Sequence, residues 1–351
     1  MPILIATDAW HPQVNGVVRT LTSLASSASA LGTDIEFLTP EGFPSMPVPT
    51  YPGLRIALPN RSEIARRIEA VSPDAIHIAT EGPIGWAVRA YCRRRKLAFT
   101  TSYTTRFPEY VSVRTGIPES IGYAVMRRFH SASSMVMVAT DSLRRELAER
   151  GFRRLGYWTR GVNTELFRPD GPAPLDLPRP IFMTMGRVAV EKNLEAFLSL
   201  DLPGSKVVVG DGPQRTELER RFPDVHFLGE KKGADLSSHL AAADVFVFPS
   251  LTDTFGVVKL EALACGTPVA AFPVTGPLDV IADHPIGAID RDLRAACLRA
   301  QHMSRDACRE FALQRSWENS ARQFLGNLVA LQPSRTLRPI RGVAGQSAVQ
   351  G

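Results

Sequence analysis

Short apolar runs alternate with amphipathic stretches along most of the chain. Each run holds four or five mainly apolar residues and ends near a turn residue, which predicts a buried parallel strand, and the stretches between runs repeat apolar residues at helical spacing. In the first half the predicted strands lie near residues 3–7, 35–39, 55–58, 75–79, 98–102 and 135–139. In the second half they lie near residues 181–185, 206–209, 225–228, 245–248 and 269–272. This alternation is typical of α/β proteins with parallel sheets.

The intervals between the strands predict helices, among them Gly16–Leu31, Ile64–Val71 and a last helix near Trp317–Leu331. Near the middle of the chain, Arg168–Pro180 holds five prolines and one glycine, so it predicts a linker without regular structure. A chain of 351 residues is also long for a single hydrophobic core. The sequence therefore predicts two domains.

We place the first domain at residues 1–170 and the second at residues 171–332, with the last helix able to return to the first domain. Residues 333–351 are rich in Pro, Gly, Ser and Arg and predict a disordered tail. Both domains have the alternating pattern of a doubly wound, Rossmann-like sheet. Ligands of such sheets bind outside the carboxyl ends of the strands, so we expect the two domains to face each other across a ligand-binding cleft.

The composition is that of an ordinary globular protein, with 44% hydrophobic and 22% charged residues. The apolar runs are far shorter than the roughly 20 residues that a membrane-spanning helix needs. The first ten residues lack the basic start of a signal peptide and predict a core strand instead. The four cysteines show no CxxC spacing, which favours reduced thiols over disulfides or a structural zinc site. We therefore expect a cytoplasmic protein.

The excess positive charge is concentrated in the first half of the chain. Residues 1–170 hold 21 Lys and Arg against 15 Asp and Glu, whereas the rest of the chain holds 20 of each. The excess includes the run Arg93–Lys96. A basic surface attracts nucleic acid, anionic lipid or an acidic substrate, although any single cluster can simply be a solvated face. The concentration in one domain favours an anionic surface as a partner.

Two cations follow the first predicted strand of the second half. Arg187 comes directly after Gly186, where the strand ends, and Lys192 lies five positions further on. A guanidinium fork and an ammonium group at the carboxyl end of a strand suit a diphosphate, although basic loops are common. Gly16 similarly stands where the first strand of the chain leads into its first helix, and a glycine there allows backbone N–H groups to approach an anion. A plain helix entry is an equal alternative for Gly16.

A third stretch, Ser250–Phe272, is mostly apolar and holds only two carboxylates. We expect a helix to begin near Phe255 and Gly256, with free N–H groups and a dipole that favour phosphate. Asp253 lies on the loop before the helix and Glu261 lies inside it, so the two acids bracket the phosphate site. This arrangement suits the sugar and the ribose of a sugar nucleotide. The alternative is a helix-capping aspartate with an incidental glutamate.

Three stretches, taken together and in this order, resemble the second half of retaining glycosyltransferases of the GT-B fold in the large GT4 family. They are GRVAVEKN, VGDGP and DTFGVVKLEALACGTPV. The first half is similar to that family through ATDAWHPQVNGVVRTL and through RGVNTELFRP before the linker. The resemblance covers about residues 2–330. It is strongest to the branch that holds sulfoquinovosyl-diacylglycerol synthases, GDP-mannose-dependent α-mannosyltransferases and bacterial glycosyl-diacylglycerol synthases.

The resemblance implies roles for individual residues. Arg187 and Lys192 would neutralise the diphosphate leaving group, and Glu261 would hold the ribose. Asp253 would contact the donor sugar. The remaining donor-binding residues that the resemblance implies are Gly16, Gly186, Phe255, Gly256 and Val257. Transfer would retain the anomeric configuration without a metal ion or another cofactor.

Two positions depart from the family pattern. The first acid of the pair is usually Glu, and here it is Asp253. Relatives commonly read Ser-Tyr-His-Thr after the fifth strand, with the His near the reacting sugar, whereas this chain has Tyr103 followed by Thr104. Tyr103 and Thr104 are therefore candidates for contacts to the sugar or the acceptor. His130 is the nearest histidine that could take the missing role, and a structural hydrogen bond at a helix end is its alternative.

The chain also contains a literal Asp-x-Asp motif at Asp290 and Asp292. In another glycosyltransferase fold this motif holds a divalent metal. Here it opens a predicted helix, where Asp is a natural N-cap, so we predict capping and no metal site.

The function expected from the sequence is transfer of a hexose from a UDP- or GDP-sugar to a membrane lipid such as diacylglycerol. The enzyme would lie peripherally on the inner face of the cell membrane, with Arg106–Ser131 admitting the lipid and the basic first domain facing anionic phospholipid. Nucleic acid is not an expected partner. Two alternatives stay open, namely the same chemistry on a soluble saccharide or metabolite, and a sugar-nucleotide epimerase, which can share the fold.

Overall fold

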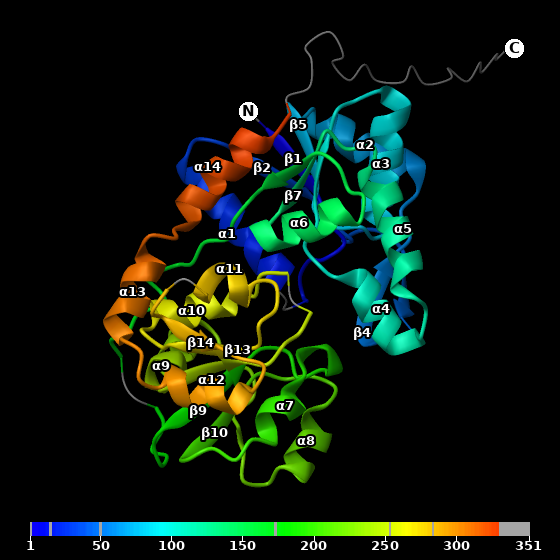
Figure 1. Cartoon of the computed structure of the whole chain (residues 1–351). Helices are drawn as coiled ribbons and strands as arrows, with labels where there is room; N and C mark the ends of the chain where they lie inside the picture. Colours follow the sequence, from blue (N-terminus) through cyan, green and yellow to red (C-terminus); the bar gives the residue numbers. More distant parts are fainter. Residues whose placement is uncertain are drawn as a thin grey trace, which may run out of the picture.

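The computed structural model describes residues 2–13, 16–48, 51–171, 174–252, 254–282 and 284–329. They form two α/β domains, one above the other in Figure 1, each built on a six-stranded parallel sheet. The predicted tail, residues 333–351, lies outside the described residues. None of the described helices is both long enough and apolar enough to span a bilayer.

The sheet of the first domain has the strand order β2-β1-β5-β6-β7-β8. Its strands are β1 (Ile3–Ala6), β2 (Ile35–Leu38), β5 (Ala75–Ile78), β6 (Thr100–Ser102), β7 (Met135–Val138) and β8 (Leu155–Tyr157). Its helices are α1 (Gly16–Ala30), α2 (Arg61–Val71), α3 (Pro83–Arg95), α4 (Phe107–Thr115), α5 (Glu119–His130) and α6 (Asp141–Glu149). Leu4 packs with α2 and α3 on one face of the sheet, while Ile5 packs with α1 on the other. Burial on both faces explains why these strands read as continuous apolar runs.

The predicted strand near residues 55–58 is not part of the parallel sheet. It falls in β4 (Tyr51–Ala57), which pairs antiparallel with β3 (Ser45–Val48) in a separate hairpin. Arg55 and Ile56 are both exposed, so this segment lacks the two apolar faces that a central parallel strand needs.

The sheet of the second domain has the strand order β11-β10-β9-β12-β13-β14. Its strands are β9 (Ile181–Met185), β10 (Ser205–Val209), β11 (His226–Phe227), β12 (Val245–Phe248), β13 (Val269–Ala271) and β14 (Gly287–Ile289). Its helices are η1 (Val190–Lys192, a 3-10 helix), α7 (Leu194–Leu198), α8 (Arg215–Arg221), α9 (Gly233–Ala242), α10 (Val258–Ala264), α11 (Pro277–Ile281), α12 (Leu293–Ala300) and α13 (Arg305–Leu313). The sequence analysis did not predict β8 and β14, which are three-residue strands at sheet edges.

The last helix, α14 (Trp317–Asn327), crosses back and packs on the first domain, beside α1 in Figure 1. Its Phe324 ring centroid lies 4.8 Å from that of Trp158. The Trp158 indole N–H donates a hydrogen bond of 3.1 Å to the hydroxyl of Ser320. The chain therefore passes between the domains twice, once through residues 168–180, whose described part carries no helix or strand, and once between α13 and α14.

Candidate active site

Loops that follow strands of both sheets meet at the boundary between the domains. In the second sheet the order of the strands reverses between β9 and β12, and in the first sheet it reverses between β1 and β5. The crevice beyond the carboxyl ends of strands at such a switch point is the usual ligand site of open α/β sheets. The loops after β9 and β12 carry most of the residues that the sequence singles out for donor binding.

Arg187 and Lys192 lie on the loop that follows β9. Gly186, at the start of this loop, has a φ of 144°, and a Cβ at its position would meet open space. Arg187 is exposed, whereas Lys192 is half-buried at the end of η1. The Asn193 side-chain amide donates to the Pro249 carbonyl at 3.1 Å. This bond holds the end of the loop, next to Lys192, beside the end of β12.

The two glycines of the VGDGP stretch have a packing role. A Cβ on Gly210 would lie 1.8 Å from the carbonyl oxygen of Gly186, and a Cβ on Gly212 would lie 2.3 Å from that of Val188. The Val188 N–H also donates to the Asp211 carbonyl at 2.9 Å. The loop after β10 can approach this closely only because it carries glycine, and it supports the loop that bears the cations.

The loop between β12 and α10 touches both domains. The Ser250 hydroxyl donates to the Glu191 carbonyl at 3.4 Å, within the second domain. The Thr254 hydroxyl donates to the Thr104 carbonyl of the first domain at 2.8 Å. Thr104 therefore lies against the loop predicted to hold the donor sugar. Asp253, the predicted catalytic acid on this loop, lies outside the described residues.

Helix α10 begins at Val258 with Val257 as its N-cap, two to three residues later than the predicted start at Phe255 and Gly256. Gly256 has a φ of 73°, a left-handed conformation that cannot belong to the helix. A Cβ on Gly256 would also lie 2.6 Å from the Phe248 ring. Position 256 therefore requires glycine for both its backbone conformation and its lack of space. The neighbouring Phe255 is buried.

Lys259 is a fully buried cation beneath this loop, and the sequence analysis did not single it out. Its ammonium group donates a hydrogen bond to the Phe255 carbonyl and lies 4.2 Å from the centroid of the Phe248 ring. A Cβ on Gly276 would lie 3.3 Å from the same nitrogen. Its sequence signal is a lysine inside an otherwise apolar helical run. In the structure it ties the Phe255–Gly256 turn to α10.

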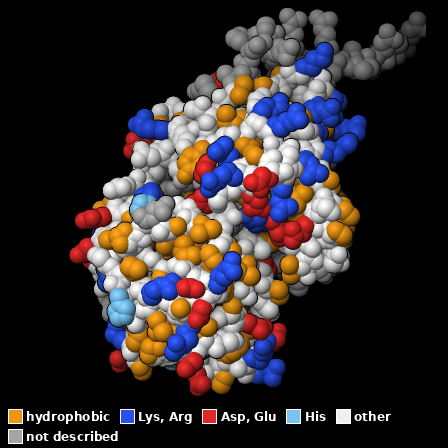
Figure 2. Space-filling view, in the orientation of Figure 1, with side chains coloured by type: hydrophobic (Ala, Val, Ile, Leu, Met, Phe, Trp, Pro, Cys, Tyr) orange, Lys and Arg blue, Asp and Glu red, His pale blue; other side chains and the backbone are white. Residues whose placement is uncertain are grey.

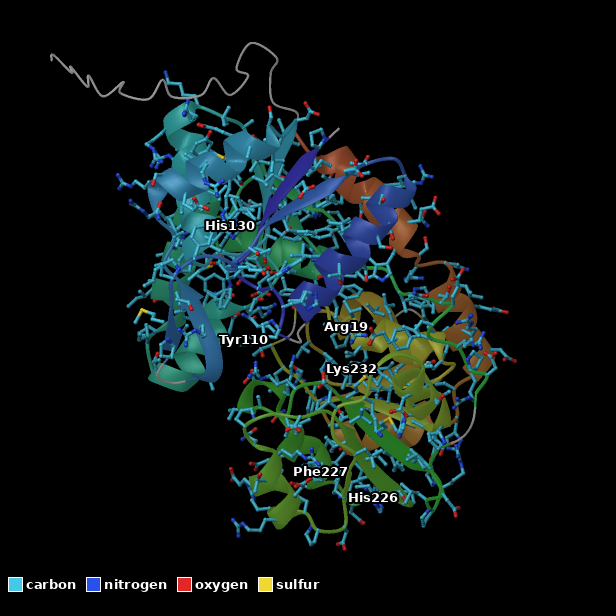
Figure 3. The ribbon with its side chains drawn as sticks, turned by 180° about the vertical axis from the view of Figure 1, so that it is seen from behind. Arg19, Tyr110, His130, His226, Phe227 and Lys232 are labelled. Atoms are coloured by element: carbon cyan, nitrogen blue, oxygen red, sulfur yellow. The ribbon has the colours of Figure 1, made fainter. Side chains whose placement is uncertain are left out.

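The first turn of α1 faces the second domain, as Figure 3 shows for Arg19. Arg19 Nη2 forms an ion pair of 2.5 Å with Glu261 Oε1 on α10, 242 positions away in the chain. Glu261 is buried, which raises the pKa of its carboxyl, and the Arg19 guanidinium opposes that shift. Gly16 opens α1, and a Cβ at its position would meet open space. Sequence reasoning missed Arg19 because nothing local marks it as a partner of Glu261.

Arg106 is a second residue that sequence reasoning missed at the domain boundary. It is buried, and it donates to Thr275 of the second domain at 3.1 Å. Within the first domain it forms ion pairs with Glu109 at 2.8 Å and with Glu146 at 2.5 Å. The Tyr123 hydroxyl donates to Glu109 at 2.6 Å. This network anchors the chain just after Thr104.

Tyr103 and His130 lie inside the first domain rather than at its boundary with the second. Tyr103 is fully buried in an apolar cluster with Tyr123. His130 ends α5, and its two ring nitrogens lie 2.9 Å from the Thr101 hydroxyl and 3.2 Å from a Glu81 oxygen. Figure 3 shows His130 well away from Arg19. Neither side chain is open to a ligand here, so the predicted contact to sugar or acceptor is corrected to a structural hydrogen-bonding role for His130 and a core role for Tyr103.

The Asp-x-Asp motif caps a helix. Asp292 is the N-cap of α12, and its side chain accepts a hydrogen bond of 2.9 Å from the Arg294 N–H. Asp290 pairs with Arg299 at 2.8 Å. Among the described residues, no group of three or more His, Cys, Asp or Glu is placed to hold a metal ion.

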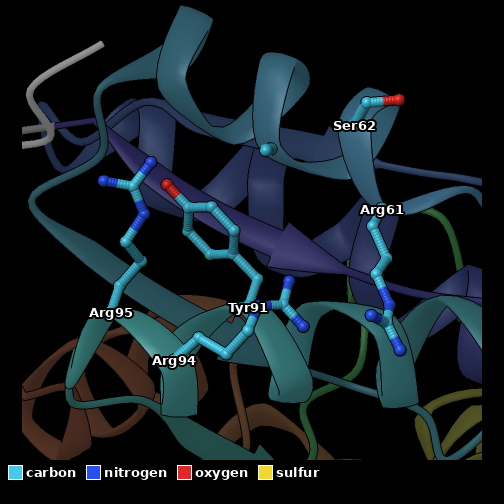
Figure 4. Close-up of a pocket in the computed structure, with 6 residues that line it drawn as sticks. Arg61, Ser62, Tyr91, Arg94 and Arg95 are labelled. Carbon is cyan, nitrogen blue, oxygen red and sulfur yellow. The ribbon is translucent and has the colours of Figure 1, made fainter. Parts of the chain in front are cut away.

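A separate cavity of about 280 Å³ opens between α2 and α3 of the first domain (Figure 4). Its lining residues are Arg61, Ser62, Ala65, Tyr91, Arg94 and Arg95. Arg95 pairs with Glu69 at 2.7 Å, and the same Glu69 oxygen accepts a hydrogen bond from Tyr91. This cavity is lined by the first domain alone and is strongly basic.

Two family models match the chain. The model described as Glycosyltransferase Family 4 matches residues 14–166, and the model described as Glycosyl transferases group 1 matches residues 179–300. The two matches correspond to the first and the second domain.

Curated relatives match the chain at low identity, two of them over nearly its whole length. A GDP-mannose-dependent alpha-mannosyltransferase of Mycobacterium tuberculosis is 27% identical over 95% of this chain and 98% of its own length. An alpha-monoglucosyldiacylglycerol synthase of Streptococcus pneumoniae is 24% identical over 92% of this chain and 83% of its own. The sulfoquinovosyl transferase SQD2 of Arabidopsis thaliana is 29% identical over 70% of this chain and 52% of its own.

Solved structures share the fold. A sucrose-phosphate synthase from Thermosynechococcus elongatus superposes with a TM-score of 0.74 at 20% identity, covering 93% of this chain and 97% of its own. HepE from Anabaena, solved in complex with UDP-glucose, superposes with a TM-score of 0.69 at 15% identity over 93% and 98% of the two chains. The chain has two Rossmann-like domains, and a family model matches each of them. It therefore belongs to the group 1 glycosyltransferases of family GT4 and is a glycosyltransferase of the GT-B fold.

Proposed function

We propose that this glycosyltransferase moves a hexose, with retention of configuration, from a UDP- or GDP-linked sugar to a membrane lipid acceptor such as diacylglycerol. The observation that carries the lipid acceptor is an exposed apolar surface on α4 and α5. These helices follow directly after Thr104 and Arg106, which contact the second domain. An acceptor held at this surface would therefore enter next to the donor loop.

The donor half of the proposal rests on Arg187 and Lys192. Both follow β9 at the switch point of the second sheet, where a diphosphate would find two cations and the open backbone at Gly186. Preorganised positive charge stabilises the anion that develops on a leaving diphosphate, so no metal ion is part of the proposal. Glu261 supplies a carboxylate that can accept a hydrogen bond from a ribose hydroxyl. We assign the donor sugar to the loop around Thr254 and Phe255.

The apolar face of the first domain is formed by six exposed side chains on and between α4 and α5. They are Phe107, Val111, Val113, Ile117, Ile121 and Val125, whose exposed fractions run from 37% to 66%. The pairs 107/111 and 121/125 each lie one helical turn apart, so they form a stripe on each helix. In Figures 1 and 3 the β3–β4 hairpin lies beside α4, and it exposes Met46 and Ile56 as well. Exposed apolar side chains gathered on two neighbouring helices suit contact with acyl chains.

A basic face accompanies the apolar face. Figure 2 shows Lys and Arg side chains gathered over α2 and α3, among them the exposed Arg61 and Arg94 that border the cavity in Figure 4. The Arg89 guanidinium donates to the carbonyls of Phe129 and Arg128 at 2.7 Å each, which fixes α3 against α5. Helix α3, which carries part of the basic face, is therefore attached to α5, which carries part of the apolar face. We propose that these two faces rest on the anionic inner face of the cell membrane, held by charge and by apolar contact.

The names of two relatives support the proposal, one for the acceptor and one for the donor. One is an alpha-monoglucosyldiacylglycerol synthase, whose name contains diacylglycerol. The other is a GDP-mannose-dependent alpha-mannosyltransferase, which supports a nucleoside diphosphate sugar as donor. A soluble acceptor is the second candidate, because a D-inositol 3-phosphate glycosyltransferase of Mycobacterium tuberculosis is 34% identical over 48% of this chain.

The test is a donor and acceptor panel with the purified full-length chain. UDP- and GDP-linked hexoses are incubated with vesicles containing diacylglycerol and, separately, with inositol phosphates and sugars. We expect a new glycolipid from one donor only in the presence of diacylglycerol. Transfer to a soluble acceptor with no lipid product would replace the lipid proposal, and a new sugar nucleotide formed without any acceptor would indicate an epimerase.

A further inference from the structure

The ion pair between Arg19 and Glu261 joins the two domains at the helix that carries the proposed ribose contact. Arg19 lies in the first turn of α1, and Glu261 lies in α10. The two side chains differ sharply in exposure, with 40% for Arg19 and 5% for Glu261. The charge that stabilises the buried carboxylate therefore comes from the other domain.

The two oxygens of Glu261 have different surroundings. Oε1 accepts the 2.5 Å hydrogen bond from Arg19. Oε2 is buried and has no hydrogen-bond partner among the described residues. An acceptor that is both buried and unpaired is unfavourable, and a hydroxyl group that donates to it removes that cost. The carboxylate is thus held at one oxygen and is ready to accept a hydrogen bond at the other.

The position of Arg19 depends on the first domain as a whole. Helix α1 packs on α14 and on the sheet through Leu21 and Leu24. Arg19 can therefore meet Glu261 only while the two domains keep the arrangement seen here. Any ligand that needs a fixed, ionised Glu261 gains affinity in this arrangement and stabilises it in return.

We propose that Arg19 is a positioning residue of the nucleotide site, which holds Oε1 of Glu261 across the domain boundary and leaves Oε2 to accept a ribose hydroxyl. The inference rests on the proposed function, because it takes a nucleoside diphosphate as the ligand. It adds that the first domain completes a binding site that lies in the second. Nucleotide affinity then depends on domain closure, and closure depends on the nucleotide.

The experiment measures the dissociation constants of UDP, GDP and ADP by calorimetry with the full-length chain, and continues with the nucleotide that the wild type binds most tightly. The variants are Arg19→Gln, Arg19→Lys, Glu261→Gln and the double variant Arg19→Gln/Glu261→Gln. Arg322→Gln is the matched control, because Arg322 also pairs with a glutamate, Glu318, but on the exposed face of α14.

We expect Arg19→Gln to weaken binding about tenfold, Arg19→Lys to restore most of the affinity, and Arg322→Gln to change nothing. If Arg19 acts through Glu261, the double variant binds within about twofold of Glu261→Gln alone. The loss of affinity caused by Arg19→Gln should disappear when the matching 2′,3′-dideoxynucleoside diphosphate is the ligand. The wild type and Arg19→Gln should bind that nucleotide equally.

The outcomes separate this inference from the proposed function. Wild-type binding to none of the nucleotides, or full affinity in Glu261→Gln, contradicts the proposed nucleotide site itself. Weakened binding in Glu261→Gln together with full affinity in Arg19→Gln overturns the role of Arg19 alone. Additive losses in the double variant, or an equal loss with the dideoxy nucleotide, would also overturn it, because Arg19 would then act elsewhere.

Discussion

The hydroxyl of Thr254 donates a 2.8 Å hydrogen bond to the main-chain carbonyl of Thr104, across 150 positions of the chain and across the domain boundary. It brings the loop between β12 and α10 of one domain against the loop after β6 of the other. Because the acceptor is a carbonyl, this contact tolerates any side chain at position 104. The bond instead depends on the hydroxyl of Thr254.

Thr254→Val removes this bond and keeps the shape of the side chain. A single neutral hydrogen bond contributes about 0.5–1.5 kcal/mol, so we expect turnover to fall about threefold to tenfold with little change in stability. Thr22→Val is the control, because the hydroxyl bonds of Thr22 to the described residues go to carbonyls of its own helix, at 3.0 and 3.1 Å. Initial rates at saturating donor check the prediction, and equal rates in both variants would contradict it.

Arg187→Ala and Lys192→Ala should each lower turnover about 100-fold or more, because loss of one preorganised charge from a developing anion costs roughly 3–4 kcal/mol. Neither side chain is buried, so thermal unfolding should be close to that of the wild type. The measurement is turnover with the active donor. Near-normal rates in both variants would contradict the assignment of the diphosphate to this loop.

Excess EDTA should leave the transferase activity largely unchanged. In the proposed mechanism, Arg187 and Lys192 would supply the charge that a metal ion supplies in other sites. The check is activity in EDTA and again after addition of Mg²⁺ or Mn²⁺. Complete loss with recovery on adding metal would contradict the prediction and direct attention to Asp290 and Asp292.

Full-length protein should sediment with anionic vesicles and not with neutral ones. Binding should weaken between low and physiological salt, because surface charges act over only about 8 Å at 0.15 M. Replacing Arg93 and Arg94 by Gln should reduce the salt-sensitive part. Replacing Val113 and Ile121 by Ser should reduce the part that salt does not remove. No binding to anionic vesicles at low salt would leave the soluble acceptor as the better proposal.

His77 should make the fold sensitive to mild acid. It is fully buried, with its ring nitrogens 2.8 Å from the hydroxyls of Thr100 and Ser102. Burial lowers the pKa of His77 to about 3 from the ordinary 6.5. In the unfolded chain, His77 therefore binds a proton below about pH 6.5, whereas in the folded protein it binds one only below about pH 3. The free energy of unfolding consequently falls as the pH drops from about 6.5 to about 3.

The expected loss from His77 is about 2 kcal/mol between pH 7 and pH 5, measured by urea unfolding at each pH. His77→Gln keeps a polar group at the site but cannot titrate, so its stability should depend less on pH in this range. His226→Gln, on the exposed edge strand β11, is the control and should behave as the wild type. An unchanged pH dependence in His77→Gln would contradict the prediction.

The strands that are buried on both faces could be predicted from the sequence, because β1 is apolar throughout and β9 is apolar except at Thr184. The edge strands β8 and β14 could not, because three residues with one paired side carry little pattern. The prediction placed strand β4 in the parallel sheet, whereas it pairs with β3 in a hairpin. A short run of strand-forming residues does not show which strand it pairs with.

The residues of the candidate site likewise fall into those with a local sequence signal and those without one. The placement of Arg187 and Lys192 after β9 could be predicted, because each lies within a few residues of the end of that strand, whereas their role stays a prediction. Arg19 and Arg106 could not, because their roles come from contacts with Glu261 and Thr275, which lie 242 and 169 positions away. Local sequence carries no signal for such contacts, and only the folded arrangement of the two domains creates them.

The return of α14 to the first domain has a mechanical consequence. Two connections, far apart in sequence, join the domains, so the domains have less freedom to separate or twist than a single tether would allow. The second connection is held at its far end, where Phe324 and Ser320 contact Trp158. Removing these contacts would lengthen the free chain between the domains and so increase that freedom.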